Sequence, residues 1–360
     1  MTAISKLHVR AVRNIVDASI DPKAGFNLLY GSNGSGKTSI LEAIHALASG
    51  KSFRSGKLDL LVQHGSDRTL VFGELASGHK FGFSKSLKEP PQLKLDGDRV
   101  RNWELIALLL PLLVLDSNTF QLADGGPQVR RAFLDWGVFH VEPSFLSNWR
   151  DVKRCIAQRN LLLRGRVFGS EQISAWDTQF ALCSDYVDTS RKKYISLFSP
   201  LFTETYSSLA PSLAEKLSLT YTRGWDESKH LEEVLLENQK LDFKYGATQA
   251  GPHRAEILLK FGKDKATDVL SRGQLKVLVI AMKIAQGQLL NTLSGRRCSF
   301  LVDDLAAELD STNRSAVLKI LHAMRGQVFI TAVERADIDT CMPESASPTT
   351  FHVERGIIKT

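Results

Sequence analysis

The sequence predicts an α/β nucleotide-binding fold that is interrupted by a long helical insertion, and three observations support this fold class. A glycine-rich loop follows an apolar run at Phe26–Tyr30 and opens a helix-like stretch at Thr38–Ala48. A second apolar run, Phe300–Val302, ends in two acids. Between these regions, over Val129–Leu241, glycine is sparse while leucine, lysine and arginine recur at helical spacings.

The glycine-rich loop, Gly31–Thr38, matches the phosphate-binding pattern G-x-x-x-x-G-K-[ST] in the strand–loop–helix context that the pattern requires. Glycines let backbone N–H groups approach phosphate oxygens at unusual dihedral angles, and the helix dipole favours an anion. We expect Lys37 to reach the β- and γ-phosphates and the Thr38 hydroxyl to hold Mg²⁺. The expected nucleotide-binding residues are Gly31, Ser32, Asn33, Gly34, Ser35, Gly36, Lys37, Thr38 and Ser39. The sequence therefore predicts binding of a nucleoside triphosphate.

Composition indicates a soluble, cytoplasmic protein. The net charge is +7 and the sequence pI is about 9.2, which permits but does not require a polyanionic partner. The four cysteines lie far apart without a C-x-x-C pair, as is typical of reduced thiols. No signal-peptide pattern is present, and the apolar run Leu105–Leu115 is too short to span a membrane and is broken by Pro111. We expect that run to be a buried core segment.

The remaining elements follow from periodicity and turn residues. In the first 100 residues we expect short strands at Leu7–Val9, Ala18–Ile20, Thr69–Phe72 and Lys80–Phe83. The insertion should contain helices at Phe145–Leu163 and Ile173–Leu201. After it we expect, in order, a strand at Glu256–Phe261, a helix at Gln274–Leu293, a strand at Cys298–Val302, a helix at Ser311–Met324 and a strand at Gln327–Ala332.

The two acids that end the run at Phe300–Val302 fit a Walker B arrangement. Asp303 would hold Mg²⁺, and Asp304 would orient and activate the attacking water as the catalytic carboxylate beside Lys37. A buried strand that ends in a polar turn would explain the same residues equally well.

A further motif precedes the long C-terminal helix. The residues Ser271, Arg272, Gly273 and Gln274 form a second potential anion-binding helix start, although Ser271 alone could be a plain N-cap. One nucleotide rarely needs two phosphate sites of this kind. We therefore expect the second site to serve the nucleotide of a partner molecule.

The phosphate loop, the L-S-x-G-Q-like signature and the paired acids together resemble the ATP-binding cassette family. This resemblance implies two ATP molecules sandwiched in a head-to-tail homodimer, with Ser271, Arg272, Gly273 and Gln274 acting on the partner's ATP. Glu308 and Asp310 resemble the D-loop that crosses the dimer interface. Lys37 and Ser271 are 234 residues apart, and so long an insertion resembles the SMC-type branch, which works on DNA.

Within that branch, four stretches resemble the RecF family of bacterial recombinational repair ATPases: Gly50–Arg54, Gly125–Asp135, Thr248–Arg254 and Leu270–Lys276. The resemblance implies an ATPase head at residues 1–125 and 246–360 and a helical arm at residues 126–245. It implies slow, DNA-stimulated ATP hydrolysis with Mg²⁺, and binding to double-stranded DNA beside single-stranded gaps. It also implies that RecR and RecO are partners in loading a strand-exchange recombinase.

The sequence departs from these families at two places. Ser117 and Asn118 stand where the RecF family has Pro-Glu or Pro-Asp, and Thr331 stands where many cassettes have a histidine that senses the γ-phosphate. Another SMC-like ATPase and a transporter-type cassette subunit are the alternative assignments. A transporter subunit would need a membrane partner and a shorter insertion.

Several basic residues allow two interpretations. Arg130 and Arg131 could bind DNA phosphates or anchor the arm, and Lys153 and Arg154 belong to a basic stretch that could be a DNA face or a solvated helix face. That stretch contains Arg150, Lys153, Arg154, Arg159, Arg164 and Arg166. His253 could sense nucleotide or stabilise the fold.

Overall fold

The computed structural model describes residues 2–165 and 171–359, which form two compact units. The first unit contains residues 1–120 and 272–360, and the second contains residues 121–271. The sequence predicts boundaries between head and arm after residues 125 and 245, whereas the two units of the structure meet after residues 120 and 271. The boundary on the C-terminal side of the insertion lies later than predicted because β10 (Glu256–Phe261) pairs along its whole length with β9 (Leu217–Thr222) of the inserted segment.

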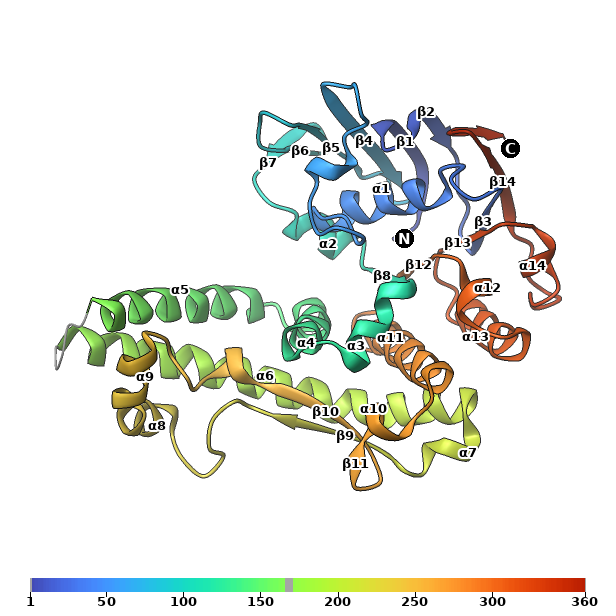
Figure 1. The fold of residues 1–360 in the computed structure, drawn as a ribbon. Helices are drawn as coiled ribbons and strands as arrows, with labels where there is room; N and C mark the ends of the chain where they lie inside the picture. The colour runs from blue at the N-terminus through green and yellow to red at the C-terminus, as the bar shows by residue number, and fades with distance from the viewer. Residues whose placement is uncertain (1, 166–170, 360) are drawn as a thin grey trace. The chain divides into compact units, whose positions relative to one another are not determined.

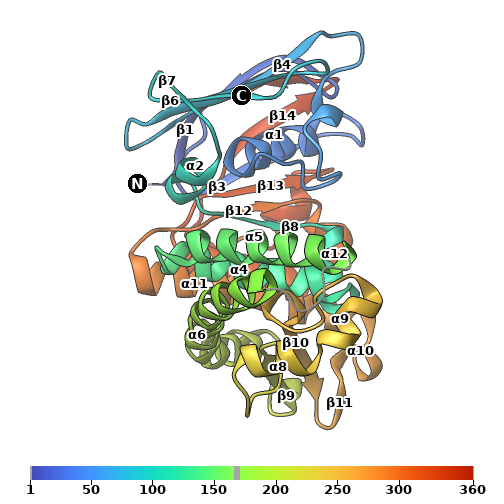
Figure 2. The ribbon, with the colours of Figure 1, turned by 90° about the vertical axis from the view of Figure 1, so that its left-hand side faces the viewer.

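The first unit contains two six-stranded sheets (Figures 1 and 2). One is antiparallel, in the order β2-β1-β4-β5-β6-β7. Its strands are β1 (Ile4–Val12), β2 (Ile15–Ile20), β4 (Arg68–Leu75), β5 (Lys80–Ser86), β6 (Gln92–Leu95) and β7 (Asp98–Val100). The expected strands at Thr69–Phe72 and Lys80–Phe83 are confirmed as parts of β4 and β5. In both strands buried and more exposed residues alternate, as they do when one face of a sheet packs on a core.

The second sheet has the order β15-β14-β3-β13-β12-β8 and is parallel except at β15. Its strands are β3 (Phe26–Tyr30), β8 (Leu112–Leu115), β12 (Ser299–Val302), β13 (Val328–Ala332), β14 (Thr349–Glu354) and β15 (Ile357–Lys359). The central strands β12 and β13 are buried at every residue, as is typical of parallel sheets covered on both faces.

Helix α1 (Lys37–Ser49) packs between the two sheets (Figure 2). Its apolar residues Ile40, Leu41, Ile44 and Leu47 share one core cluster with residues of both sheets. The other helices of this unit are α2 (Glu104–Leu109), α11 (Arg272–Ser294), α12 (Leu305–Glu308), α13 (Ser311–Ala323) and α14 (Ala336–Asp339). The apolar run Leu105–Leu115 is divided by Pro111 into α2 and the buried strand β8.

In the second unit, α5 (Phe145–Arg164) lies beside the 39-residue α6 (Glu171–Leu209), as Figure 1 shows. The other helices are α3 (Gln121–Asp124), α4 (Pro127–Val141), α7 (Pro211–Ala214), α8 (Leu231–Glu237), α9 (Gln239–Tyr245) and α10 (Ala266–Val269). Strands β9, β10 and β11 (Asp264–Lys265) form a small antiparallel sheet. The inserted segment is therefore not purely helical, because the alternating pattern of Leu217–Thr222 forms β9.

Among the described residues, α11 is the one helix long and apolar enough to cross a membrane by length and composition. A share of 67% of its most apolar window is buried inside the structure. A buried core helix meets the same criterion, so α11 is weak evidence for a membrane span.

Candidate nucleotide site

The phosphate loop lies between β3 and α1, where the expected glycine conformations are present. Gly34 and Gly36 have φ values of 77° and 119°, which only glycine adopts readily. A Cβ atom at Gly31 would overlap the carbonyl oxygen of Val353. The loop thus needs glycine both for its backbone shape and for its close approach to β14.

Lys37 is almost fully buried at the start of α1. Its ammonium group donates to the carbonyl oxygens of Gly31 (2.5 Å) and Ser32 (2.9 Å). Burial lowers the pKa of Lys37, while the negative charges of Asp304 and Asp303 oppose that shift. The lysine is therefore folded over the loop and lies in the field of the two acids.

The structure brings the two sequence motifs together through one hydrogen bond. Thr38 Oγ1 donates to Asp303 Oδ1 at 2.9 Å, although the two residues are 265 positions apart. Burial raises the pKa of Asp303, whereas the hydrogen bonds from Thr331 and Thr38 lower it. Asp304 follows in a left-handed conformation (φ 51°) and is exposed.

These residues line a cleft of about 700 Å³ in the first unit, whose lining includes Asn33, Gly34, Gly36, Lys37, Thr38, Ser39, Asp303 and Asp304. Inside the loop, the Ser35 hydroxyl is buried and finds no hydrogen-bond partner among the described residues. Arg13 and Asn14 also line the cleft. The side chain of Asn14 joins the loop to α1, because it donates to Gly34 O (2.9 Å) and accepts from Ser39 Oγ (2.8 Å).

The sequence singled out Thr331 only for the histidine that it replaces, and it gave no role to Asp116. Thr331 Oγ1 donates to Asp303 Oδ1 (2.8 Å) and accepts from the backbone N–H of Asp304 (2.9 Å), so one hydroxyl contacts the carboxylate of one acid and the backbone of the other. Asp116 follows β8, whose Leu115 is in register with Val302 of β12. Asp116 and Asp303 therefore leave neighbouring parallel strands at one edge. The signal was an apolar run ending in an acid, as at Phe300–Asp303.

The signature residues do not line this cleft among the described residues. Ser271, Arg272, Gly273 and Gln274 are all exposed, and α11 begins at Arg272 rather than at Gln274. In the D-loop segment, Glu308 forms an ion pair with Lys276 (2.7 Å). Asp310 is the N-cap of α13, where it accepts from the backbone N–H of Asn313 (2.9 Å).

The residues considered for DNA contact differ in their surroundings. Arg130 makes a bidentate pair with Glu256 (2.8 Å for each bond), and Arg131 donates to Ala255 O (2.9 Å). Lys153 is exposed, whereas the exposed Arg154 is paired with Asp151 at 3.0 Å. Arg166 lies outside the described residues.

Comparison with known proteins agrees with this geometry. The family profile described as RecF/RecN/SMC N terminal domain matches residues 3–358. The chain is 41% identical to a DNA replication and repair protein RecF from Pseudomonas syringae pv. tomato, over 99% of this chain and 98% of that protein. A protein of the same name from Pseudomonas fluorescens is also 41% identical, with the same coverage.

Solved structures show the same fold. The recombination mediator protein RecF-ATP of the RecFOR pathway superposes with a TM-score of 0.86 at 22% identity, covering 99% of this chain and 96% of that one. An SMC head bound to the C-terminal winged-helix domain of ScpA gives a TM-score of 0.60 at 16% identity, covering 99% and 96%. The predicted class, a mixed α/β head of the ATP-binding cassette type, is confirmed.

Proposed function

The chain belongs to the RecF family of SMC-type ATPases, and from this premise we propose that it is an ATP-dependent DNA-binding protein of replication and recombinational repair. The observation that carries the proposal is the hydrogen bond between Thr38 and Asp303. It places the phosphate loop and the Walker B strand end in one cleft with Lys37 and Asp304.

The cleft fits ATP and Mg²⁺. Its volume suits a nucleotide, and its lining includes Lys37, Thr38 and Ser39 of the phosphate-binding motif. The described residues contain no cluster of three or more metal-binding side chains. Mg²⁺ is commonly held by one or two protein oxygens plus phosphates, which fits Thr38 and Asp303. When bound, the ion would neutralise charge on the β- and γ-phosphates.

Hydrolysis would depend on Asp304. Its carboxylate projects from a strand end into the cleft, and its backbone is held by Thr331. In this position Asp304 orients the attacking water, while Lys37 stabilises the phosphates. We expect a weak, DNA-stimulated ATPase, since Thr331 is bound to the acids where many cassettes have a γ-phosphate-sensing histidine.

ATP-dependent homodimerisation would complete the site. The four signature residues are exposed, and within the described chain they do not line the cleft of their own copy, which is consistent with a role toward a second copy. In this proposal Ser271 and Gly273 close on the partner's γ-phosphate, and Glu308 and Asp310 lie near the interface. Loss of the γ-phosphate after hydrolysis then releases the dimer.

The names of the relatives support a DNA repair role, and the matched structure belongs to a protein of the RecFOR pathway. We propose that gapped double-stranded DNA, RecR and RecO are partners of this chain, and that it acts in the cytoplasm. We also propose that residues 1–125 and 246–360 act as the ATPase head and residues 126–245 as the arm.

The deciding experiment measures ATP hydrolysis against protein concentration, with and without gapped duplex DNA. A DNA-gated dimer gives a rate that rises faster than linearly with protein concentration and rises again when DNA is added.

The variant Asp304→Asn should bind ATP but hydrolyse it at least tenfold more slowly, because the attacking water loses its base. A linear rate that is indifferent to DNA would contradict the proposal.

A further inference from the structure

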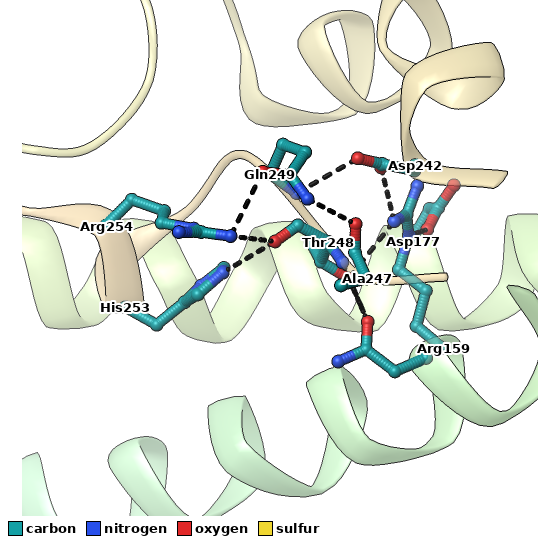
Figure 3. Close-up of polar contacts among 9 residues, drawn as sticks. Arg159, Asp177, Asp242, Ala247, Thr248, Gln249, His253 and Arg254 are labelled. Carbon is teal, nitrogen blue, oxygen red and sulfur yellow. Dashed lines mark hydrogen bonds and ion pairs between the residues drawn. The ribbon is translucent and has the colours of Figure 1, made fainter. Parts of the chain in front are cut away.

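The loop Thr248–Arg254 of the second unit is held by a buried ionic clamp (Figure 3). The clamp centres on Arg159, whose side chain is fully buried. Its Nε lies 2.6 Å from Asp177 Oδ1 of α6, and its Nη1 lies 2.6 Å from Asp242 Oδ2 of α9. Nη1 also donates to Thr248 Oγ1 at 3.1 Å.

The clamp also holds the backbone of the loop. Asp242 Oδ1 accepts from the Gln249 N–H at 2.9 Å. Asn160 Oδ1 accepts from both the N–H and the hydroxyl of Thr248 at 2.8 Å. Buried ion pairs often contribute little net stability compared with apolar packing. The main effect of these bonds is therefore to hold Thr248 and Gln249 in one position.

The far end of the loop is fixed as well. Gly251 has a φ of 132°, and a Cβ there would lie 2.6 Å from the ring of Phe180. Pro252 O accepts from Arg191 Nη1 at 2.7 Å, and the buried Arg191 is itself paired with Asp135. Figure 3 shows His253 and Arg254 on the side of Thr248 opposite Arg159.

Most arginines around this loop are neutralised by carboxylates, but Arg254 is not. Arg130, Arg159 and Arg191 each have an acidic partner within 3 Å. Arg254 is exposed, and in the described part of the chain its guanidinium contacts neutral oxygens, Gln249 Oε1 (3.0 Å) and Thr248 O (3.4 Å). Within residues 2–165 and 171–359, no ion pair joins Arg254 to a carboxylate.

Arg131 lies next to this unpaired charge. Its Nη1 donates to the carbonyl oxygen of Ala255, the residue after Arg254, and in the described part of the chain it has no carboxylate within ion-pair distance. Burial lowers the pKa of Arg131, as do the positive charges of Arg191 and Arg254, while the carboxylates of Glu256 and Asp135 oppose the shift. The charges of Arg131 and Arg254 therefore lie close enough to interact.

Lys153 of α5 adds a further positive charge. It is exposed, and its ammonium lies 5.4 Å from the centre of the Trp149 ring, which the Arg191 guanidinium also approaches at 4.9 Å. Burial raises the pKa of the Asp135 carboxyl, while the nearby charges of Arg191, Lys153 and Arg131 oppose this. Helices α4, α5 and α6 thus each present a cation, Arg131, Lys153 and Arg191, near one half-buried carboxylate.

We propose that Arg131, Lys153 and Arg254 bind phosphates of a duplex nucleic-acid backbone. Residues 121–271 carry 20 Lys and Arg against 19 Asp and Glu, so the unit as a whole is nearly neutral and its attraction for a polyanion must be local. A guanidinium fork held in place suits phosphate, and more than one unpaired cation suits a repeating anion. This inference rests on the proposed function and names the residues that would carry it.

The test is the salt dependence of binding to duplex DNA by the full chain with ATP and Mg²⁺. Arg254→Ala is the main variant, because its exposed side chain can be removed while the ion pairs of Arg159 with Asp177 and Asp242 remain. Each lost phosphate contact should reduce the slope of log K against log salt by about 0.9, whatever the DNA sequence. Lys153→Ala and Arg131→Ala should each give a similar reduction.

The matched control is Arg154→Ala, which removes a neighbouring cation of α5 that already has Asp151 as its partner. Its slope should stay close to that of the unaltered chain. Equal reductions in the control and in Arg254→Ala would show only a general loss of charge and would overturn the inference. Unchanged slopes in all three variants would overturn it as well.

Two further outcomes separate the sources of phosphate. If the unaltered chain itself shows no salt-dependent binding to duplex DNA, the proposed function fails before the inference is reached. If Arg254→Ala weakens binding of a fluorescent ATP analogue in the absence of DNA, the phosphate belongs to a nucleotide, and the duplex assignment is wrong. A thermal melt of each variant identifies any that have lost the fold. Arg254→Lys keeps the positive charge and should restore most of the salt dependence of DNA binding.

Discussion

At the residue scale, the site depends on single polar atoms that each serve two neighbours. Thr331 shows this, because its hydroxyl bonds Asp303 and the backbone of Asp304 at once. Lys37 shows it too, since its ammonium holds two carbonyl oxygens of the loop that it would leave for phosphate. Substitutions here should therefore act on nucleotide binding more than on folding.

We expect Lys37→Ala to weaken ATP binding by about tenfold to a hundredfold, because a hydrogen bond to a charged group is worth about 1.5–3 kcal/mol. Titration with a fluorescent ATP analogue measures the dissociation constant. Lys57→Ala is the control, since Lys57 is exposed and absent from the cleft lining. Unchanged affinity in Lys37→Ala would reject the assignment of the loop.

His253 should make stability depend on pH. Burial is the largest cause that lowers the pKa of His253 to about 4, from an ordinary value near 6.5. Between these values the unfolded chain binds more protons than the folded one, so stability falls as the pH drops below 6.5. From pH 6.5 to 5 the loss from this group is about 2 kcal/mol.

Thermal melts at pH 7 and pH 5 check this expectation. His253→Gln should show a smaller drop in melting temperature than the unaltered chain, because glutamine does not titrate. An equal drop in both proteins would show that His253 is accessible to protons in the folded state.

At the scale of elements, α1 links the loops on both sides of the phosphate site through one buried carboxylate. Glu42 is fully buried and accepts two bonds from Arg13 (3.0 and 2.7 Å) and one from the Ser52 hydroxyl. Ser52 in turn accepts from the N–H groups of Arg54 and Ser55. The helix thus fixes the segments before and after it as well as the loop.

Glu42→Ala should destabilise the fold by about 3 kcal/mol, because it leaves the partly buried Arg13 without its partner. The midpoint of urea unfolding measures the effect. The control is Asp17→Ala, which removes an exposed carboxylate near His8 and Arg10 and should cost less than about 1 kcal/mol. Similar shifts for the two variants would contradict the anchoring role of Glu42.

At the scale of the whole molecule, the proposed cycle needs two chains. Ser271→Arg introduces a bulky cation at an exposed signature position, so a single chain should still bind ATP while ATP-dependent dimerisation is abolished. Light scattering with ATP, alongside the binding titration, distinguishes the two properties. Dimers that persist in Ser271→Arg would reject the role of the signature residues toward a partner.

The sequence predicted those parts of the fold that depend on local patterns. The strand at Phe26–Tyr30, the strand at Glu256–Phe261 and the helix that starts at Ser311 are confirmed almost to the residue, because periodicity and flanking turns determine them locally. Strand β9 was missed because its alternation is short and stands between helical stretches. The C-terminal hairpin of β14 and β15 was also missed, because both strands are short.

By itself the sequence determined the family, the fold class and the phosphate-loop chemistry, since each resides in contiguous residues whose types and spacing suffice. Only the tertiary structure decided which distant residues meet. It joined Thr38 to Asp303 across 265 positions and gave Thr331 its two partners. Among the described basic residues, it separated those with a carboxylate partner, such as Arg130, from those without one, such as Arg254. Pairing of charges depends on distance in space, which the order of residues along a chain does not specify.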